Sequence, residues 1–322
     1  MTTITAPFPW FGGKSRAASL IWERLGSNIG NYVEPFLGSA AVALNRPPQF
    51  AGWMTLNDLD GNIANFWRSV QLNPDEVALH ACQPVNEIEL HARHLWLVNN
   101  LPNLPPRLMA DPDYHEPRTA GWWAWGACNW IGGGWCAGGG PWSTAPDDEG
   151  IPAFQHVGGK GVSKQLPHLG NGGKGISRQM PGLTGGEGRL AWLSEWMGEL
   201  SRLTFGARIT CGEWERICSV GTMTRNGVCG VLLDPPYSTT GAVYAHDSSS
   251  VSGDVREWCK ANGENPELRI ALCGYEGEGH EELQALGWQV ETWAAKGGYQ
   301  GAENRERIWF SPHCLGQQGR LF

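Results

Sequence analysis

The chain has 322 residues, and its 24 Lys and Arg against 32 Asp and Glu give a formal net charge of −8. With 41% hydrophobic and 17% charged residues, the composition is typical of a globular protein with a sizeable core and excludes a disordered chain. No apolar run reaches about 18 residues, and the N-terminus lacks a secretory signal, so we expect a cytoplasmic protein without a membrane span. Nine cysteines without a C-x-x-C spacing argue against a disulfide scaffold or a zinc knuckle, and we expect no bound metal.

Strand and helix patterns alternate at both ends of the chain. The first part predicts a helix at 15–25, a turn at 34–38, a helix at 39–44, a strand at 53–56 and a helix at 62–70. The last part predicts strands at 207–211, 228–233, 269–273, 288–293 and 307–311, with helices at 252–261 and 280–286. This alternation indicates an α/β sheet that binds its ligands at the carboxyl ends of the strands.

The middle of the chain has a different character. It predicts helices at 75–82 and 87–98, a Pro-rich break at 101–107, a Trp-rich stretch at 121–130, a Gly-rich segment at 132–188 and an amphipathic helix through 190–200. We therefore predict one catalytic domain formed by residues 1–72 and 207–322. Residues 73–206 would be an inserted target-recognition region.

The Gly-rich segment contains a basic repeat. Residues 158–170 align with residues 172–184, and eight of the 13 aligned positions are identical. The two copies carry cations and amides at matching positions, namely Lys160, Lys164 and Gln165, then Lys174, Arg178 and Gln179. One interpretation is a solvated surface loop. The other is a paired arm that follows a phosphate backbone and offers side chains to base edges, which predicts a double-stranded DNA partner despite the acidic net charge.

The strongest local signal is Asp234-Pro235-Pro236-Tyr237, directly after an apolar run. A carboxylate there accepts a hydrogen bond from an amino group, the prolines leave carbonyl acceptors without donors, and a Tyr ring stacks on a flat heterocycle. Together they predict a site for an exocyclic amine in the plane of a ring. The alternatives are an ordinary buried strand with a capping residue, or a magnesium-binding Asp of a nucleotide hydrolase. The hydrolase alternative fails because Phe8 stands where the phosphate-binding loop needs a Gly.

Four segments, in this order, resemble the D12 class of adenine-specific DNA methyltransferases. They are Pro9-Trp10-Phe11-Gly12-Gly13-Lys14, Tyr32-Val33-Glu34-Pro35-Phe36-Leu37-Gly38, Leu56-Asn57-Asp58-Leu59-Asp60 and Asp234-Pro235-Pro236-Tyr237. The resemblance spans roughly residues 1–70 and 207–322, and the Trp-rich stretch is similar to phage-type members. It implies a Rossmann-like fold that uses S-adenosylmethionine, with a mostly parallel seven-stranded sheet.

The resemblance also implies roles by position. The residues expected to bind S-adenosylmethionine are Trp10, Gly12, Lys14, Glu34, Pro35, Phe36, Gly38, Asp58 and Asp234. Among them, Asp58 would bind the adenosine moiety and Asp234 would touch both cofactor and target. One departure is Ala40, where the family commonly has a second Gly, so we expect a slightly altered turn.

The predicted function is methyl transfer to N6 of adenine in DNA, with the catalytic positions Asp234, Pro235, Pro236 and Tyr237. The target base would flip out of the duplex, and its amine would attack the methyl group directly. One alternative is methylation of cytosine N4, because the same pocket accepts that amine. A more distant alternative is a non-catalytic DNA-binding protein on the same fold. The sequence predicts no particular oligomeric state.

Overall fold

The computed structural model describes residues 4–10, 13–100, 104–111, 113–130, 135–136, 142–146, 152–154, 186–236, 248–292 and 306–316. The basic repeat at 158–184 lies outside these residues, as do Gly12 and Tyr237.

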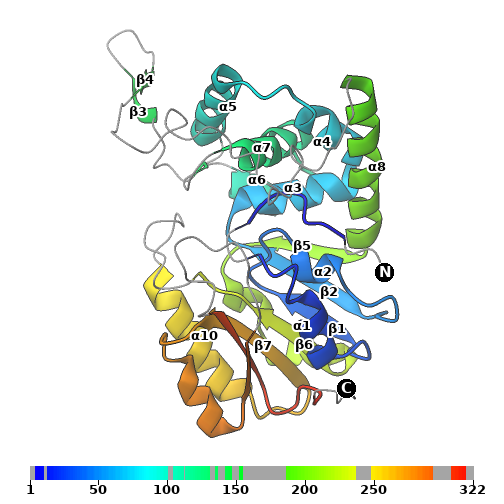
Figure 1. Cartoon of the computed structure of the whole chain (residues 1–322), viewed down its shortest axis with the longest axis vertical. Helices are drawn as coiled ribbons and strands as arrows, with labels where there is room; N and C mark the ends of the chain where they lie inside the picture. Colours follow the sequence, from blue (N-terminus) through cyan, green and yellow to red (C-terminus); the bar gives the residue numbers. More distant parts are fainter. Residues whose placement is uncertain are drawn as a thin grey trace.

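Within the described residues, seven strands form one sheet in the order β5-β2-β1-β6-β7-β9-β8 (Figure 1). The strands are β1 (Asn31–Glu34), β2 (Trp53–Asp58), β5 (Ala207–Cys211), β6 (Cys229–Leu233), β7 (Leu268–Tyr275), β8 (Gln289–Thr292) and β9 (Glu306–Phe310). β9 runs antiparallel to β7 and β8, and the other neighbouring pairs are parallel. The predicted mostly parallel seven-stranded sheet is therefore confirmed.

Successive side chains along the central strands face two helical layers in turn, one on each side of the sheet. Tyr32, Leu232 and Cys273 face one cluster, which contains side chains of α1 (Ala18–Leu25) and α2 (Ala41–Leu44). Val33 and Leu272 face the opposite cluster, with side chains of α10 (Ser248–Asn262) and the 3-10 helix η1 (Trp214–Ile217). Because β6 and β7 are buried on both faces, they read as nearly continuous apolar runs in the sequence. The short elements α9 (Val220–Met223) and η2 (Thr224–Asn226) precede β6.

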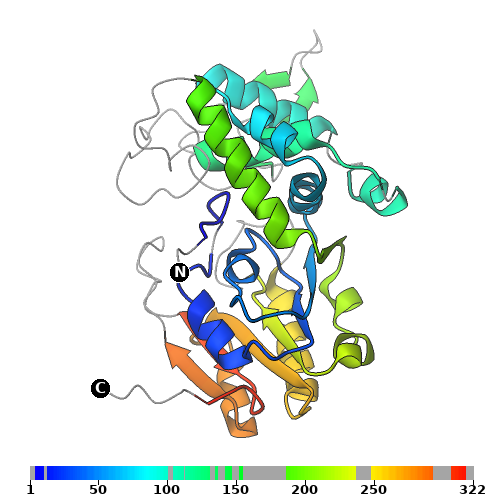
Figure 2. The ribbon, with the colours of Figure 1, turned by 90° about the vertical axis from the view of Figure 1, so that its right-hand side faces the viewer.

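A group of helices lies beyond one end of the sheet, and its longest member, α8, reaches down toward the sheet in both views (Figures 1 and 2). The group contains α3 (Gly61–Leu72), α4 (Pro74–Ala81), α5 (Glu87–Asn100), α6 (Leu104–Ala110), α7 (Pro117–Asn129) and α8 (Gly186–Thr204). α3 follows the carboxyl end of β2 and contacts both α7 and α8. The helices therefore stand over the carboxyl ends of the parallel strands. The predicted boundary between residues 72 and 73 remains a prediction.

Two details of the sequence prediction are corrected. The expected Pro-rich break at 101–107 is wrong over its second half, because α6 begins at Leu104. Pro105 and Pro106 lie in the first turn of that helix, where backbone N–H groups have no intrahelical acceptor and a missing donor costs nothing. The segment His280–Leu286 is a 3-10 helix, η3, instead of an α-helix.

Within the Gly-rich segment, β3 (Trp142–Pro146) and β4 (Pro152–Phe154) form a small antiparallel pair.

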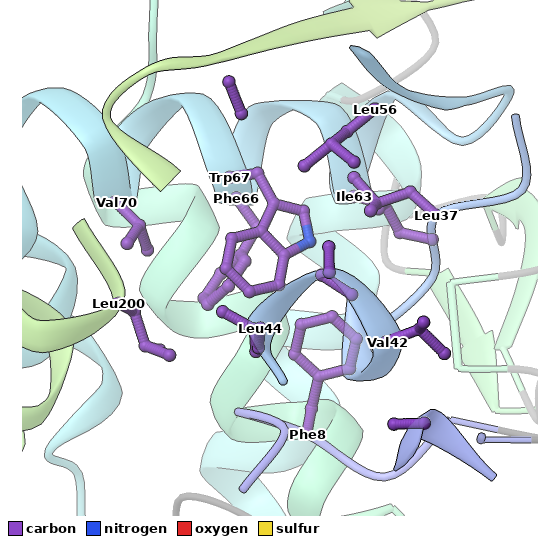
Figure 3. Packing of buried hydrophobic residues seen from close by; sticks show 14 of the residues in the cluster. Phe8, Leu37, Val42, Leu44, Leu56, Ile63, Phe66, Trp67, Val70 and Leu200 are labelled. Atoms are coloured by element: carbon purple, nitrogen blue, oxygen red, sulfur yellow. The ribbon is translucent and has the colours of Figure 1, made fainter. Parts of the chain in front are cut away.

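A buried cluster joins the helical group to the sheet (Figure 3). The Trp67 indole from α3 sits between Phe66, Ile63 and Leu56, and Phe8 approaches from the N-terminal segment (Figure 3). Trp67 is fully buried, and its Nε1 donates a hydrogen bond of 3.1 Å to the carbonyl of Gly38. A buried indole N–H needs such a partner. This contact fixes the turn after β1 against α3.

Candidate active site

The sheet changes direction between β1 and β6. From β1 the order runs to β2 and β5 on one side, and to β6, β7, β9 and β8 on the other. In open α/β sheets this switch point opens a crevice at the carboxyl ends of the strands. Glu34 ends β1, Asp58 ends β2, and Asp234 follows directly after β6. Three predicted site residues therefore meet at the place where such folds bind ligands.

The centre of the site is an ion pair between Lys14 and Asp234. Lys14 Nζ lies 3.0 Å from Asp234 Oδ2, and the Lys14 side chain is only 3% exposed, against 20% for Asp234. Burial lowers the pKa of Lys14, but the interactions with Asp234, Cys273 and Glu306 together outweigh burial and hold that pKa above its usual value. Lys14 therefore stays a cation, and the structure brings it to Asp234, a pairing that the sequence did not predict.

Glu34 is a buried carboxyl group at the end of β1. It is 4% exposed, and its Oε2 accepts a hydrogen bond of 2.9 Å from the Tyr32 hydroxyl. Burial raises the pKa of Glu34 to about 8, the Tyr32 hydrogen bond opposes this rise, and the nearby Asp234 charge adds to it. The side chain therefore holds a proton over part of the neutral range and is poised to ionise beside a cationic ligand.

Asp58 supports the turn that follows β1. Its Oδ2 accepts from the Gly38 backbone N–H and its Oδ1 from the Asp60 N–H, both at 2.9 Å. Burial raises the pKa of Asp58 to about 7, although these two N–H groups act against the rise. The neighbouring Asn57 donates to the carbonyls of Pro35 and Gly212. Because a carboxylate has about four acceptor positions, Asp58 can still accept from a ligand hydroxyl.

The turn itself has a left-handed backbone at two positions. Gly38 has φ +47°, and a Cβ there would lie 2.5 Å from Trp10 Cδ1 and Nε1. The Trp10 ring thus covers the face of Gly38 and also contacts Phe8 and Trp123. Ala40 has φ +55°, so it keeps the left-handed backbone that suits glycine, at a cost of about 1 kcal/mol.

The remaining predicted residues fall into two groups. Pro35 and Pro235 are buried, and Pro236 is half-buried. The ring centroids of Phe36 and Trp214 lie 6.2 Å apart. Gly12, Tyr237, Lys160, Lys164, Gln165, Lys174, Arg178 and Gln179 lie outside the described residues. The same sheet edge also holds three residues that were not predicted for the site, namely Tyr32, Asn57 and Glu306. Strand alternation is the signal that could have found Tyr32, since it lies two residues before Glu34 and on the same face.

Replacing Gly38 with alanine should lower the free energy of unfolding by about 1–3 kcal/mol, because it combines a positive φ with overlap on the Trp10 ring. Gly198→Ala in α8 is the matched control. A Cβ at position 198 meets nothing within 4 Å, and alanine favours the helix, so we expect a gain of up to about 1 kcal/mol. Urea denaturation of both variants tests this prediction. Equal stability changes in the two would contradict the close contact between Trp10 and the turn.

The raised pKa values of Glu34 and Asp58 predict a fall in stability with rising pH. In this range the folded protein binds protons that the unfolded chain, with ordinary carboxyl pKa values, has released. From pH 6.5 to 8 the unfolding free energy should decrease by about 2 kcal/mol, and Glu34→Gln should remove most of the decrease. His94 opposes part of this decrease, because burial lowers its pKa in the folded protein to about 4 while the unfolded imidazole still binds protons near pH 6.5.

Urea denaturation across this pH range measures the slope, with Glu23→Gln as the control. Glu23 lies on the exposed side of α1, so this variant should keep the slope of the unmodified protein. A pH-independent stability in the unmodified protein would show that Glu34 ionises normally.

The strand order, the switch point and the carboxyl groups at its edge define the class of the protein as a Rossmann-like methyltransferase fold. The family model of the D12 class N6 adenine-specific DNA methyltransferases matches residues 10–92, about a quarter of the chain. These residues carry that family's domain, which supports DNA methyltransferase activity. A search of curated proteins finds no match.

Among the described residues, no group of three or more His, Cys, Asp or Glu side chains is placed to hold a metal ion. In the same part of the chain, no helix has both the length and the apolar character that crossing a membrane requires.

Proposed function

We propose that this protein transfers the methyl group of S-adenosylmethionine to N6 of adenine in DNA. The observation that carries the proposal is the position of Asp234, at the switch point of the sheet and level with the ends of β1 and β2. The family match over residues 10–92 supports adenine as the target. The half-buried Asp234 carboxylate is an acceptor suited to an exocyclic amine.

The residues around Asp234 fit S-adenosylmethionine, which carries an ammonium group, a sulfonium group and two ribose hydroxyls. Because Gly38 has no Cβ, the Trp10 ring packs directly on the turn, where it would offer the cofactor a flat apolar surface. Asp58, at the end of β2, has the position and the free acceptor capacity for ribose hydroxyls. The buried Glu34 carboxyl would ionise next to the cationic part of the cofactor. When bound there, the cofactor supplies an electrophilic methyl group.

The chain's own residues would orient the amine for attack. Hydrogen bonds from the amine to Asp234 and the Pro235 carbonyl would localise its lone pair and direct it toward the methyl group. Alignment of this kind is the main source of rate when no strong base is required. A paired base is out of reach in the duplex, so it would flip out at a cost of a few kcal/mol, partly offset by stacking on Tyr237.

The test is incubation of the full chain with unmethylated plasmid DNA and methyl-labelled S-adenosylmethionine, followed by digestion to nucleosides and chromatography. The proposal expects the label in N6-methyladenine. Label in N4-methylcytosine would assign the pocket to cytosine instead. If DNA binds but no nucleoside carries label, the chain is a non-catalytic DNA-binding protein and the proposal is wrong.

A further inference from the structure

A further acidic residue, Glu306, belongs to the same sheet edge. It is the first residue of β9 and pairs in register with Tyr275, the last residue of β7. Strand alternation places Glu306 on the same face as Ile308, which packs in the cluster shared with α1 and Cys273. Strand alternation also places Asp234, the ion-pair partner of Lys14, on the face of Leu232, which packs in the same cluster. Glu306 thus faces the side of the sheet that holds Lys14 and Asp234.

The Glu306 side chain is buried and incompletely bonded. The residue is 8% exposed, and its Oε2 is inaccessible to solvent with no hydrogen-bond partner among the described residues. A buried carboxylate oxygen without a donor is costly, and native proteins rarely keep one without a reason. The unbonded Glu306 Oε2 therefore indicates that a hydrogen-bond donor reaches this atom in some step of the protein's function.

Electrostatics links this carboxylate to the ion pair. Burial raises the pKa of Glu306, the Lys14 ammonium opposes this, and the Asp234 charge adds to it. The pKa of Tyr275 also rises, through burial first and the Glu306 charge second. One buried ammonium group therefore acts on two carboxylates, and its described contact, at 3.0 Å, is with Asp234.

We propose that Glu306 is a positioning residue that takes over the Lys14 ammonium when Asp234 accepts the N–H of the target amine. This inference rests on the proposed function. The Lys14 ammonium lies on Asp234 Oδ2, and a carboxylate whose charge is neutralised by a cation accepts more weakly from a neutral amine. Since Lys14 is 3% exposed, it needs a second buried anion before it can release Asp234. Glu306 supplies that anion.

The first test uses Glu306→Gln and Glu306→Leu in the full chain. The leucine variant removes the charge without leaving an unpaired polar group, so it guards against a folding defect of the glutamine variant. The control is Glu276→Gln, next to Tyr275, where the side chain is 58% exposed. We measure single-turnover methyl transfer at saturating S-adenosylmethionine, and cofactor affinity by calorimetry.

Both Glu306 variants should transfer methyl roughly 10- to 100-fold more slowly, with cofactor affinity within about twofold of the unmodified protein and Glu276→Gln unaffected. Unchanged rates would overturn the proposal. Equal losses in the Glu276 control would assign the effect to the general negative charge of this edge. Weaker cofactor binding with an unchanged rate at saturation would make Glu306 a cofactor ligand instead.

The second test needs no activity. A double-mutant cycle between Lys14→Met and Glu306→Leu is measured by urea denaturation, once with Asp234 and once with Asp234→Asn. The coupling between Lys14 and Glu306 should be larger in the Asp234→Asn background, because the ammonium no longer divides its interaction between Glu306 and a second carboxylate at position 234. Equal or zero coupling in both backgrounds would refute the transfer of Lys14. If the unmodified protein methylates no DNA, the proposed function fails while this cycle still decides the pairing.

Discussion

Replacing Asp234 with asparagine should lower single-turnover methyl transfer by at least about 10³-fold, because the amine loses the anionic acceptor that orients it. The structure predicts a second effect, on the stability of the fold. The substitution removes the carboxylate that contacts the buried Lys14 ammonium, which should reduce the unfolding free energy by on the order of 3 kcal/mol. Rapid-quench assays with labelled cofactor and urea denaturation measure the two effects.

The double variant Lys14→Met/Asp234→Asn separates catalysis from folding. It removes both charges of the pair, so stability should return toward that of the unmodified protein while methyl transfer stays lost. Recovery of transfer in the double variant would mean that Asp234 serves only to neutralise Lys14. That outcome would contradict the role of Asp234 in orienting the amine.

Neutralising the basic repeat should weaken DNA binding and flatten its salt dependence. Replacing Lys160, Lys164, Lys174 and Arg178 with glutamine removes four cations from a stretch without acidic residues. If each contacts a phosphate, the slope of log affinity against log salt should fall by about 3.6 in magnitude, and affinity near 0.1 M salt by roughly three orders of magnitude. Fluorescence anisotropy with a labelled duplex at several salt concentrations measures both quantities.

Each copy of the repeat can be tested separately. The pairs Lys160/Lys164 and Lys174/Arg178 should each lower the slope by about 1.8, because the copies carry their cations at matching positions. The matched control neutralises two exposed arginines of the described chain, Arg202 and Arg225. An equal slope change in that control would assign the effect to overall charge, and no change in any pair would identify the repeat as a solvated loop.

Local sequence patterns predicted most of the sheet. The strand at 207–211 agrees with β5 at both ends, since Ala207 to Cys211 is bounded by a turn on each side. The strand expected at 53–56 extends to Asp58, because Asn57 and Asp58 continue to pair with Thr210 and Cys211. Such pairing depends on a partner about 150 residues away, which local propensity does not contain. The start of α6 at Leu104 was missed for a local reason, because its two prolines suggested a break although a first helical turn tolerates them.

The sequence by itself determined the class of site, because Asp58 and Asp234 each follow a strand pattern whose carboxyl end must lie at one edge of a parallel sheet. Only the tertiary structure decided which charged residues lie next to one another at this site. Lys14 and Asp234 are 220 residues apart, and Glu306 reaches the same edge on an antiparallel strand at the far end of the chain. Burial and charge pairing arise from packing between distant segments, and no local pattern encodes which buried cation will neutralise which acid.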